Sequence, residues 1–161
     1  MCSSDLFDDI AVRMGQPTGE SSPTTHVSTG SGFFTGTPVW IPNPHCVSVV
    51  GDLAEAGQLD APPEVDPAST FPDGVNVEFI ERRGTAHIGM RTYERGVGET
   101  LACGSGACAA AYVWAVREGL PAGWSVRVDV LGGTVFVDSN ADGELTLRGP
   151  ARIVAQGTTW L

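Results

Sequence analysis

The segment that most constrains this fold is a stretch of ten residues, Ala107 to Val116, without a charged side chain. Every residue in it is Ala, Cys, Tyr, Val or Trp. A helix that is apolar on all of its faces is buried, so we predict a helix that runs through the middle of a curled sheet. Ser105 is placed to cap its start, and Arg117 and Gly119 suit its C-terminal end.

The rest of the chain is expected to be mostly β. The 161 residues include 21 Gly and 11 Pro, which indicates many turns. Runs of β-branched and apolar residues predict strands at Asp9–Met14, Val39–Ile41, Cys46–Val50, Val75–Glu81, Thr85–Tyr93, Trp124–Leu131, Thr134–Asp138, Glu144–Arg148 and Ala151–Ala155.

The segments between these strands carry turn and loop signals. We expect hairpin turns at Arg82–Gly84 and Gly132–Gly133. The polar stretch Thr18–Thr25 and the proline-rich stretch Ala61–Pro72 are expected to be loops. Asp52 is expected to cap a short helix, Leu53–Gly57.

The charge balance excludes several classes of partner and chemistry. The chain carries 19 acidic and 9 basic residues, for a net charge of −10. Nucleic acids and anionic membrane surfaces attract clustered Lys and Arg, so we expect neither as a partner. All the basic residues are arginine. The missing lysine excludes Schiff-base chemistry carried by this chain, including pyridoxal phosphate chemistry, and it excludes a P-loop.

The sequence has no targeting signal that we recognise. No apolar run approaches the ~20 residues that a membrane-spanning helix needs, and the basic start and apolar stretch of a signal peptide are absent. We therefore expect a cytoplasmic protein. Its cysteines are then expected to be reduced thiols: Cys2, Cys46, Cys103 and Cys108. There is no Cys-x-x-Cys pair, so we expect no structural zinc site.

The clearest candidate for chemistry is Cys103-Gly104-Ser105-Gly106, directly before the apolar stretch. Glycines let the backbone approach a ligand closely, and the unpaired N–H groups at a helix start bind carboxylates or phosphates. The same position is expected to lower the pKa of a thiol below its free value of about 8.5. Two interpretations stay open: a reactive thiolate beside an anion cradle, or a core cysteine at a tight helix entry.

A second candidate lies just upstream, in the charged segment Tyr93–Thr100. Arg95 could clamp a carboxylate through two hydrogen bonds, and Glu94 could receive an ammonium group. The alternative is a solvated charged turn, which is the usual environment of Glu and Arg.

Three segments carry a resemblance when they are taken together: Asn43–Val47 (NPHCV), Phe71–Phe79 (FPDGVNVEF) and Glu94–Gly106 (ERGVGETLACGSG). Their order and spacing resemble the C-terminal half of the diaminopimelate epimerase family, and the similarity runs from about Phe7 to Leu161. The resemblance implies an α+β fold, in which a barrel-like sheet wraps around one central buried helix. This would be one of two pseudo-symmetric domains, with the site in the cleft between them.

The resemblance also implies a mechanism without cofactor or metal. The family inverts an α-carbon of diaminopimelate, a precursor of lysine and peptidoglycan, with two cysteines on opposite faces of the substrate. One thiolate removes the α-proton, and the other thiol returns a proton from the far side. By resemblance, Cys103 is one of these two catalytic cysteines. Gly104 and Ser105 match the positions that hold the reacting carboxylate through backbone N–H groups.

Further positions match the family's substrate-binding residues. Three of them correspond to the polar group that recognises the distal end of the substrate: Asn43, Asn76 and Arg95. His45 and Glu94 resemble residues that bind substrate and tune the pKa of the thiols. For His45, a role in fixing the Pro-Asn-Pro-His loop stays open.

The sequence departs from the family because the first half, with its own cysteine in a Cys-Gly-Asn-Gly segment, does not occur here. We therefore expect a fragment that is inactive alone. Residues 1–6 are a candidate for foreign sequence, and residues 7–17 for the last strand of a missing N-terminal domain. Residues 18–148 would form the C-terminal epimerase domain, and residues 149–161 a terminal strand that returns to the missing domain. The expected partners are diaminopimelate and that domain, and a homodimer stays open.

Two other functions stay open. One is a related isomerase on the same fold, such as a proline or hydroxyproline racemase or a phenazine-biosynthesis-like enzyme. Glu94, Arg95 and Asn76 favour the epimerase over these, because a distal amino-acid head group needs such contacts. The other is a non-catalytic domain that retained a ligand cradle.

Overall fold

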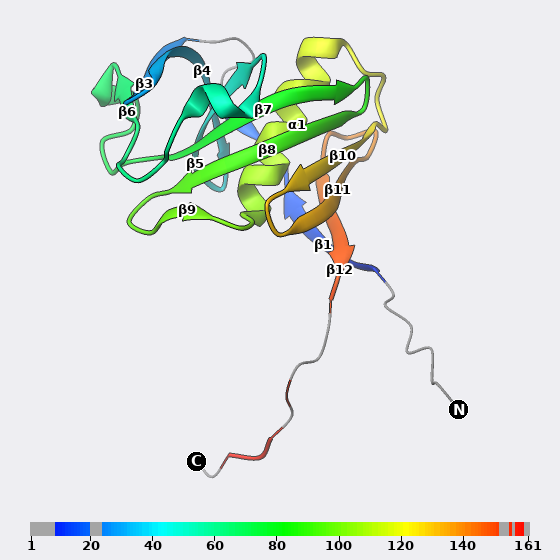
Figure 1. Cartoon of the computed structure of the whole chain (residues 1–161). Coiled ribbons are helices and arrows are strands. Elements are labelled where there is room, and N and C mark those ends of the chain that lie inside the picture. Colours follow the sequence, from blue (N-terminus) through cyan, green and yellow to red (C-terminus); the bar gives the residue numbers. More distant parts are fainter. Residues whose placement is uncertain (1–8, 20–23, 152–154, 156, 160–161) are drawn as a thin grey trace.

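A computed structural model of the chain describes residues 9–19, 24–151, 155 and 157–159 (Figure 1). Its strands are β1 (Asp9–Gly15), β2 (Thr18–Gly19), β3 (Thr25–Thr29), β4 (Gly32–Ile41), β5 (Asn43–Val50), β6 (Glu64–Asp66), β7 (Asn76–Gly84), β8 (His87–Glu94), β9 (Gly98–Thr100), β10 (Ser125–Val130), β11 (Gly133–Ser139) and β12 (Leu145–Pro150). The helices are α1 (Gly104–Glu118) and two 3₁₀ turns, η1 (Leu53–Ala56) and η2 (Ala68–Thr70).

The buried helix is confirmed. From Gly106 to Ala111 every residue of α1 is buried, and Trp114 is buried two turns from the start of that run. The helix contacts strands β4, β5, β7, β8, β10, β11 and β12, so the sheet curls around it (Figure 1). The fold is therefore α+β, with one helix inside a mixed sheet.

The sheet runs in the order β1-β12-β11-β10-β8-β7-β5-β4-β3-β6, with β2 added beside β4 and β9 beside β8. Most neighbours are antiparallel, but β5 with β7 and β8 with β10 are parallel. Parallel neighbours need a crossover connection, and α1 lies in the connection from β8 to β10. The start of the helix is thereby brought back to the end of β8.

The ends of α1 only partly follow the sequence prediction. Arg117 lies in the last turn, and Gly119 closes the helix in the left-handed conformation, with φ 63° and ψ 39°. The predicted Ser105 cap is wrong: Cys103 occupies the cap position with extended backbone, and its side chain makes no capping bond. Ser105 therefore lies inside the first turn. At η1 the predicted cap is confirmed, since Asp52 and Glu55 form a reciprocal capping box.

Three sequence predictions fail, two of them at the sheet edges. The predicted loop Thr18–Thr25 contains β2 and the start of β3, which take their hydrogen bonds from β4. The predicted loop Ala61–Pro72 contains β6, which pairs with β3, and η2. The turn expected at Arg82–Gly84 lies at Thr85–Ala86, because β7 continues through a register shift between Arg82 and Gly84.

The chain ends were also assigned from sequence. Residues 1–6 and most of the predicted strand Ala151–Ala155 lie outside the described residues, and Ala151 and Ala155 themselves are not in a strand. Within the described part, β1 pairs antiparallel with β12. The division into a 7–17 strand and a 149–161 strand of another domain stays a prediction. No helix among the described residues is long and apolar enough to cross a membrane.

A second apolar cluster covers the outer side of the sheet, opposite α1. It combines residues of the sheet with η1 and the loops around it: Val27, Cys46, Val50, Ala56, Leu59, Phe71, Val77 and Phe79. Strands β5 and β7 therefore bury both of their sides over most of their length. This explains why Cys46–Val50 and Val77–Ile80 are almost continuously apolar.

A polar cluster joins the parallel strands β8 and β10. The carboxylate of Asp129 accepts hydrogen bonds from His87 (2.7 Å), Thr134 (2.8 Å), Arg127 (2.8 Å) and Arg83 (2.9 Å). Partial burial alone would raise the pKa of Asp129, but these hydrogen bonds together hold it well below the usual range of a carboxyl.

We predict that Asp129→Asn lowers the free energy of unfolding by about 1–3 kcal/mol at neutral pH. A carboxyl whose pKa is lowered by folding stabilises the fold above its unfolded pKa of about 4, and this contribution is lost as the pH falls toward the folded pKa. Urea denaturation from neutral to acidic pH should show a shallower acid-side loss of stability in the variant. Asp60→Asn, at an exposed loop position, is the control; an equal loss in both variants would contradict the prediction.

Candidate active site

The candidate site lies where the covering of α1 changes from apolar to polar. Each of the adjacent strands β5, β7 and β8 has one row of side chains that faces the helix. These rows pack on α1 through Val47, Ile80 and Met90. Because side chains alternate along a strand, the next residues on the same side are His45, Glu78 and Thr92. The register pairs Glu78 with Thr92 and His45 with Asn76, so the polar ends of all three rows meet.

The centre of this polar end is a buried pair between His45 and Glu78. His45 Nδ1 lies 2.7 Å from Glu78 Oε1, and neither side chain is exposed at all. Thr92 donates from Oγ1 to the same carboxylate oxygen at 3.3 Å. On the other side of the ring, Nε2 lies 3.2 Å from Asn43 Oδ1. The chain therefore brings two predicted site residues, Asn43 and His45, into one hydrogen-bonded group.

Glu78 was missed as a site residue from the sequence. It sits between Val77 and Phe79 in a predicted strand, where both neighbours are buried. An acidic residue in such a run is a recognisable signal, because Glu is rarely fully buried unless it is paired. The pairing partner His45 lies 33 positions away, and it is brought near by the parallel register of β5 and β7.

Gly106 is the point where the start of α1 meets this pair. A Cβ atom built at Gly106 would lie 2.6 Å from Glu78 Oε1 and 3.2 Å from Cys103 Sγ. The helix start, the carboxylate and the thiol therefore share one small space. The absence of a side chain at position 106 is what lets them approach.

Cys103 is at the cap position of α1 and is 8% exposed. Its Sγ lies 3.7 Å from Ser105 Oγ and accepts a hydrogen bond from the backbone of Gly106. The sequence prediction of a lowered thiol pKa is wrong for this chain. Burial raises the pKa of Cys103 above its ordinary value, and the charges of Glu78 and Glu94 act in the same direction. The hydrogen bonds at the helix start offset only part of this.

The first turn of α1 leaves its N–H groups directed out of the helix. The helical hydrogen bonds begin with Ala107 N–H to the Cys103 carbonyl at 2.9 Å, so the N–H groups of Gly104 and Ser105 precede the ladder. Gly104 is exposed and Ser105 is half-buried. That these two groups hold an anion stays a prediction.

Glu94 and Arg95 follow β8 at the same end of the sheet. Glu94 Oε1 accepts a hydrogen bond from Thr100 Oγ1 at 2.5 Å, which ties the end of β8 to β9. The backbone N–H of Arg95 donates to Asn76 Oδ1 at 2.8 Å. Asn76 is the register partner of His45, so the Arg95 backbone is held next to the group around His45, although Arg95's side chain points elsewhere.

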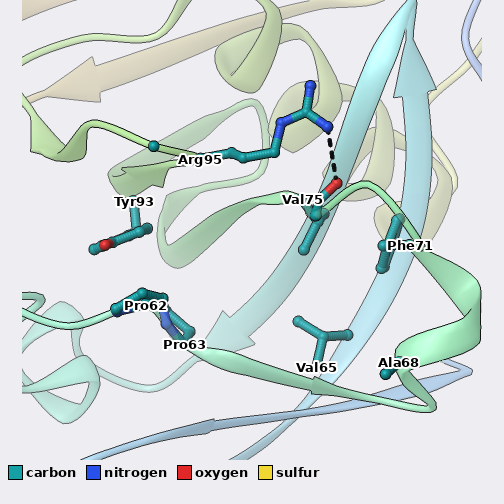
Figure 2. A pocket seen from close by; sticks show the side chains of 10 residues that line it. Pro62, Pro63, Val65, Ala68, Phe71, Val75, Tyr93 and Arg95 are labelled. Atoms are coloured by element: carbon teal, nitrogen blue, oxygen red, sulfur yellow. Dashed lines mark hydrogen bonds between the residues drawn. The ribbon is translucent and has the colours of Figure 1, made fainter.

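The guanidinium of Arg95 lines a separate pocket of about 310 Å³ on the outer side of the sheet (Figure 2). Its Nη1 donates to the carbonyls of Asp73 and Gly74 at 2.6 and 3.2 Å. The rest of the lining is mainly apolar and includes Pro62, Val65, Phe71 and Tyr93. Neither Cys103 nor His45 lines it, so this pocket is distinct from the space at the start of α1.

The two other described cysteines are free thiols that pack in the core. Burial raises the pKa of Cys46 and of Cys108 to about 12 in each case. Cys46 Sγ also lies 3.2 Å from Thr25 Oγ1. Among the described residues, no group of three or more His, Cys, Asp or Glu side chains could hold a metal ion.

The fold is shared with proteins of known structure. A solved hydroxyproline epimerase from Agrobacterium vitis, with bound trans-4-OH-L-proline, has the same fold, with a TM-score of 0.64 and 14% identity; the match covers 92% of this chain and 51% of that one. The chain thus has the architecture of epimerases. Residues 39–154 match the family model of diaminopimelate epimerase, and the chain belongs to this family.

Two curated relatives, both named diaminopimelate epimerase, support this. The relative from Streptomyces coelicolor is 46% identical over 95% of this chain and 55% of its own length. The relative from Leptospira biflexa is 42% identical over 75% of this chain and 42% of its own length. The chain therefore spans about half the length of the curated relatives it matches.

We predict that Gly106→Ala destabilises the chain by about 1–3 kcal/mol, because the new methyl group would overlap the Glu78 carboxylate. The direction of the change in unfolding free energy is informative, because Gly→Ala in a helix otherwise stabilises by up to about 1 kcal/mol. Urea denaturation measures the difference. In a Glu78→Ala background the penalty should shrink. A stabilising Gly106→Ala change in the unaltered chain would show that the carboxylate does not occupy this space.

Proposed function

We propose that the chain supplies one wall of a two-walled, cofactor-independent epimerase site for diaminopimelate, with Cys103 as one of two acid/base cysteines. The observation that carries the proposal is the place of this thiol. Cys103 occupies the cap position of the largely buried helix α1, beside the N–H groups of Gly104 and Ser105 that precede the helical hydrogen bonds. A proton donor and an anion site are therefore adjacent.

The chemistry follows from that adjacency. In one direction, the Cys103 thiol donates its proton to the α-carbon and is left as a thiolate, while the opposite cysteine has removed the original α-proton. In the other direction, the Cys103 thiolate removes the proton. Charge that develops on the carboxylate is stabilised by the N–H groups of Gly104 and Ser105. The raised pKa of Cys103 fits a resting state in which Cys103 is the donor.

The distal end of the substrate would be recognised by the polar strand ends. Asn43 and Asn76 lie on the side of the sheet that faces α1, and Glu94 offers a carboxylate to an ammonium group. Arg95 is held by Asn76 through its backbone, but its guanidinium lies in the separate pocket on the outer side of the sheet, so its contact with the head group rests on the family resemblance alone. Residues from three strands would thereby read one head group.

The second wall is part of the proposal. The relatives are about twice as long as the matched region, and we assign the other cysteine and the opposite wall to a second domain that resembles this one. A cytoplasmic role in lysine and peptidoglycan precursor synthesis follows from this assignment. The hydroxyproline epimerase shares the fold at 14% identity, which does not favour its substrate over diaminopimelate.

We predict that these 161 residues alone do not epimerise diaminopimelate, because one thiol cannot serve both faces of the α-carbon. The measurement is solvent-deuterium incorporation at the α-carbon, together with stereochemical analysis of the product. Incorporation with inversion at enzymatic rates would overturn the two-wall proposal.

We predict that Cys103→Ala abolishes inversion in an active protein that joins this chain to an N-terminal domain, such as that of the Streptomyces coelicolor relative. Cys108→Ala is the matched control, because Cys108 lies in the same helix and packs in the core. The control should retain most of the activity. Epimerisation by the Cys103→Ala protein at the parent rate would remove Cys103 from its role.

A further inference from the structure

The proposed mechanism does not use Glu78, although its carboxylate is the most unusual group near the site. The side chain is fully buried, and within the described residues its Oε2 has no hydrogen-bond partner. A carboxylate in such a place is costly unless it is paired. Its retention therefore points to a task that an apolar side chain would not perform.

The first contact of Glu78 defines the orientation of His45. An ionised carboxylate only accepts hydrogen bonds, so the 2.7 Å contact requires the proton on His45 Nδ1. The other ring nitrogen faces Asn43 at 3.2 Å, and that amide can present either its oxygen or its nitrogen to Nε2. The carboxylate, rather than the amide, therefore determines which ring nitrogen carries a proton.

The second contact of Glu78 is with the start of α1. Its Oε1 lies 2.6 Å from the point where a Gly106 side chain would begin, and Cys103 Sγ lies 3.2 Å from the same point. No described side chain lies at that point, because residue 106 is glycine. The charge of Glu78 therefore acts on the thiol across a short, water-poor distance, where electrostatic effects are strong.

We propose that Glu78 is a positioning residue of this site: it holds His45 with Nδ1–H directed at Oε1 and presents its negative charge to Cys103 from beneath the start of α1. Any effect of Glu78 on catalysis rests on the proposed function. The orientation of the His45 ring and the effect on the Cys103 thiol do not depend on it.

The other groups that face Cys103 act differently. Glu94, at the end of β8, is the second negative charge that opposes ionisation of the thiol, and the Ser105 hydroxyl and Gly106 N–H favour it. Cys108, one turn along α1, is a neutral thiol. His45 contacts Glu78 and is not among the influences on the pKa of Cys103. A change at Glu78 therefore alters one charge and leaves burial, the largest influence on the pKa of Cys103, in place.

The first test uses the unaltered chain, labelled with ¹⁵N-histidine, and the His45→Gln variant to assign the signals. Two-bond ¹H–¹⁵N correlations report which ring nitrogen carries a proton. We expect His45 to carry a proton on Nδ1 in the folded chain. A ring protonated on Nε2 alone would overturn the proposal. This result does not depend on whether any Glu78 variant folds.

The second test compares Glu78→Gln with the unaltered chain. The rate of iodoacetamide alkylation at the Cys103 peptide is followed against pH by mass spectrometry. Gln keeps the shape and removes the charge, so we expect the midpoint of the Cys103 profile to move to lower pH. Glu81→Gln is the matched control on the same strand, because Glu81 bonds to Leu53 and Arg83 instead. An unchanged midpoint in Glu78→Gln, or an equal shift in the control, would overturn the proposal.

Both readouts are made without substrate, so their failure is distinguishable from failure of the proposed function. If the tests succeed and no protein containing this chain epimerises diaminopimelate, Glu78 still sets the state of His45 and Cys103, and the substrate assignment is wrong. If an active protein is obtained and either test fails, the epimerase proposal stands without Glu78.

Discussion

The structure depends on the burial of one helix. A helix that is apolar on every face has to be covered on every face, and here the sheet does this by curling around α1 from β4 to β12. Strands that surround one helix necessarily end near its two termini. At the N-terminal end, the rows that pack on α1 change from Val47, Ile80 and Met90 to polar residues. The site is a consequence of how the helix is enclosed.

That enclosure also explains the electrostatics of the site. The short distance from the helix start to the His45–Glu78 pair is available because Gly106 has no side chain. Replacing a buried ion pair with apolar residues of similar volume is often neutral or stabilising, so packing alone does not account for this pair. Breaking it by removing one partner is costly, because the other charge stays buried. The fold therefore couples the stability of the core to the contact between the two buried groups next to Cys103.

Elements that depend on their own residues could be predicted from the sequence. Elements and properties that depend on the surrounding structure could not. The helix followed from ten apolar residues, and its end from Gly119. The strands β2 and β6 were missed because they are two and three residues long and depend on neighbouring strands for their hydrogen bonds. The expected pKa of Cys103 had the wrong sign, since helix-start hydrogen bonds can be inferred locally whereas burial and the charge of Glu78 cannot. Asn43, His45, Asn76 and Glu94 were found as members of motifs, but their hydrogen-bond partners were not.

The same division separates the residues that enclose α1 from those that do not. The hydroxyproline epimerase from Agrobacterium vitis shares the fold at a TM-score of 0.64 with 14% identity, so enclosing a central helix does not require one particular sequence. Asn43, Glu94 and Arg95 lie at or beyond the strand ends, where they are not needed to cover α1. They can therefore vary without loss of the core. His45 and Glu78 are fully buried against the helix start, and a change there would alter the thiol and the fold together. The strand ends can therefore change with less effect on the fold than this buried pair.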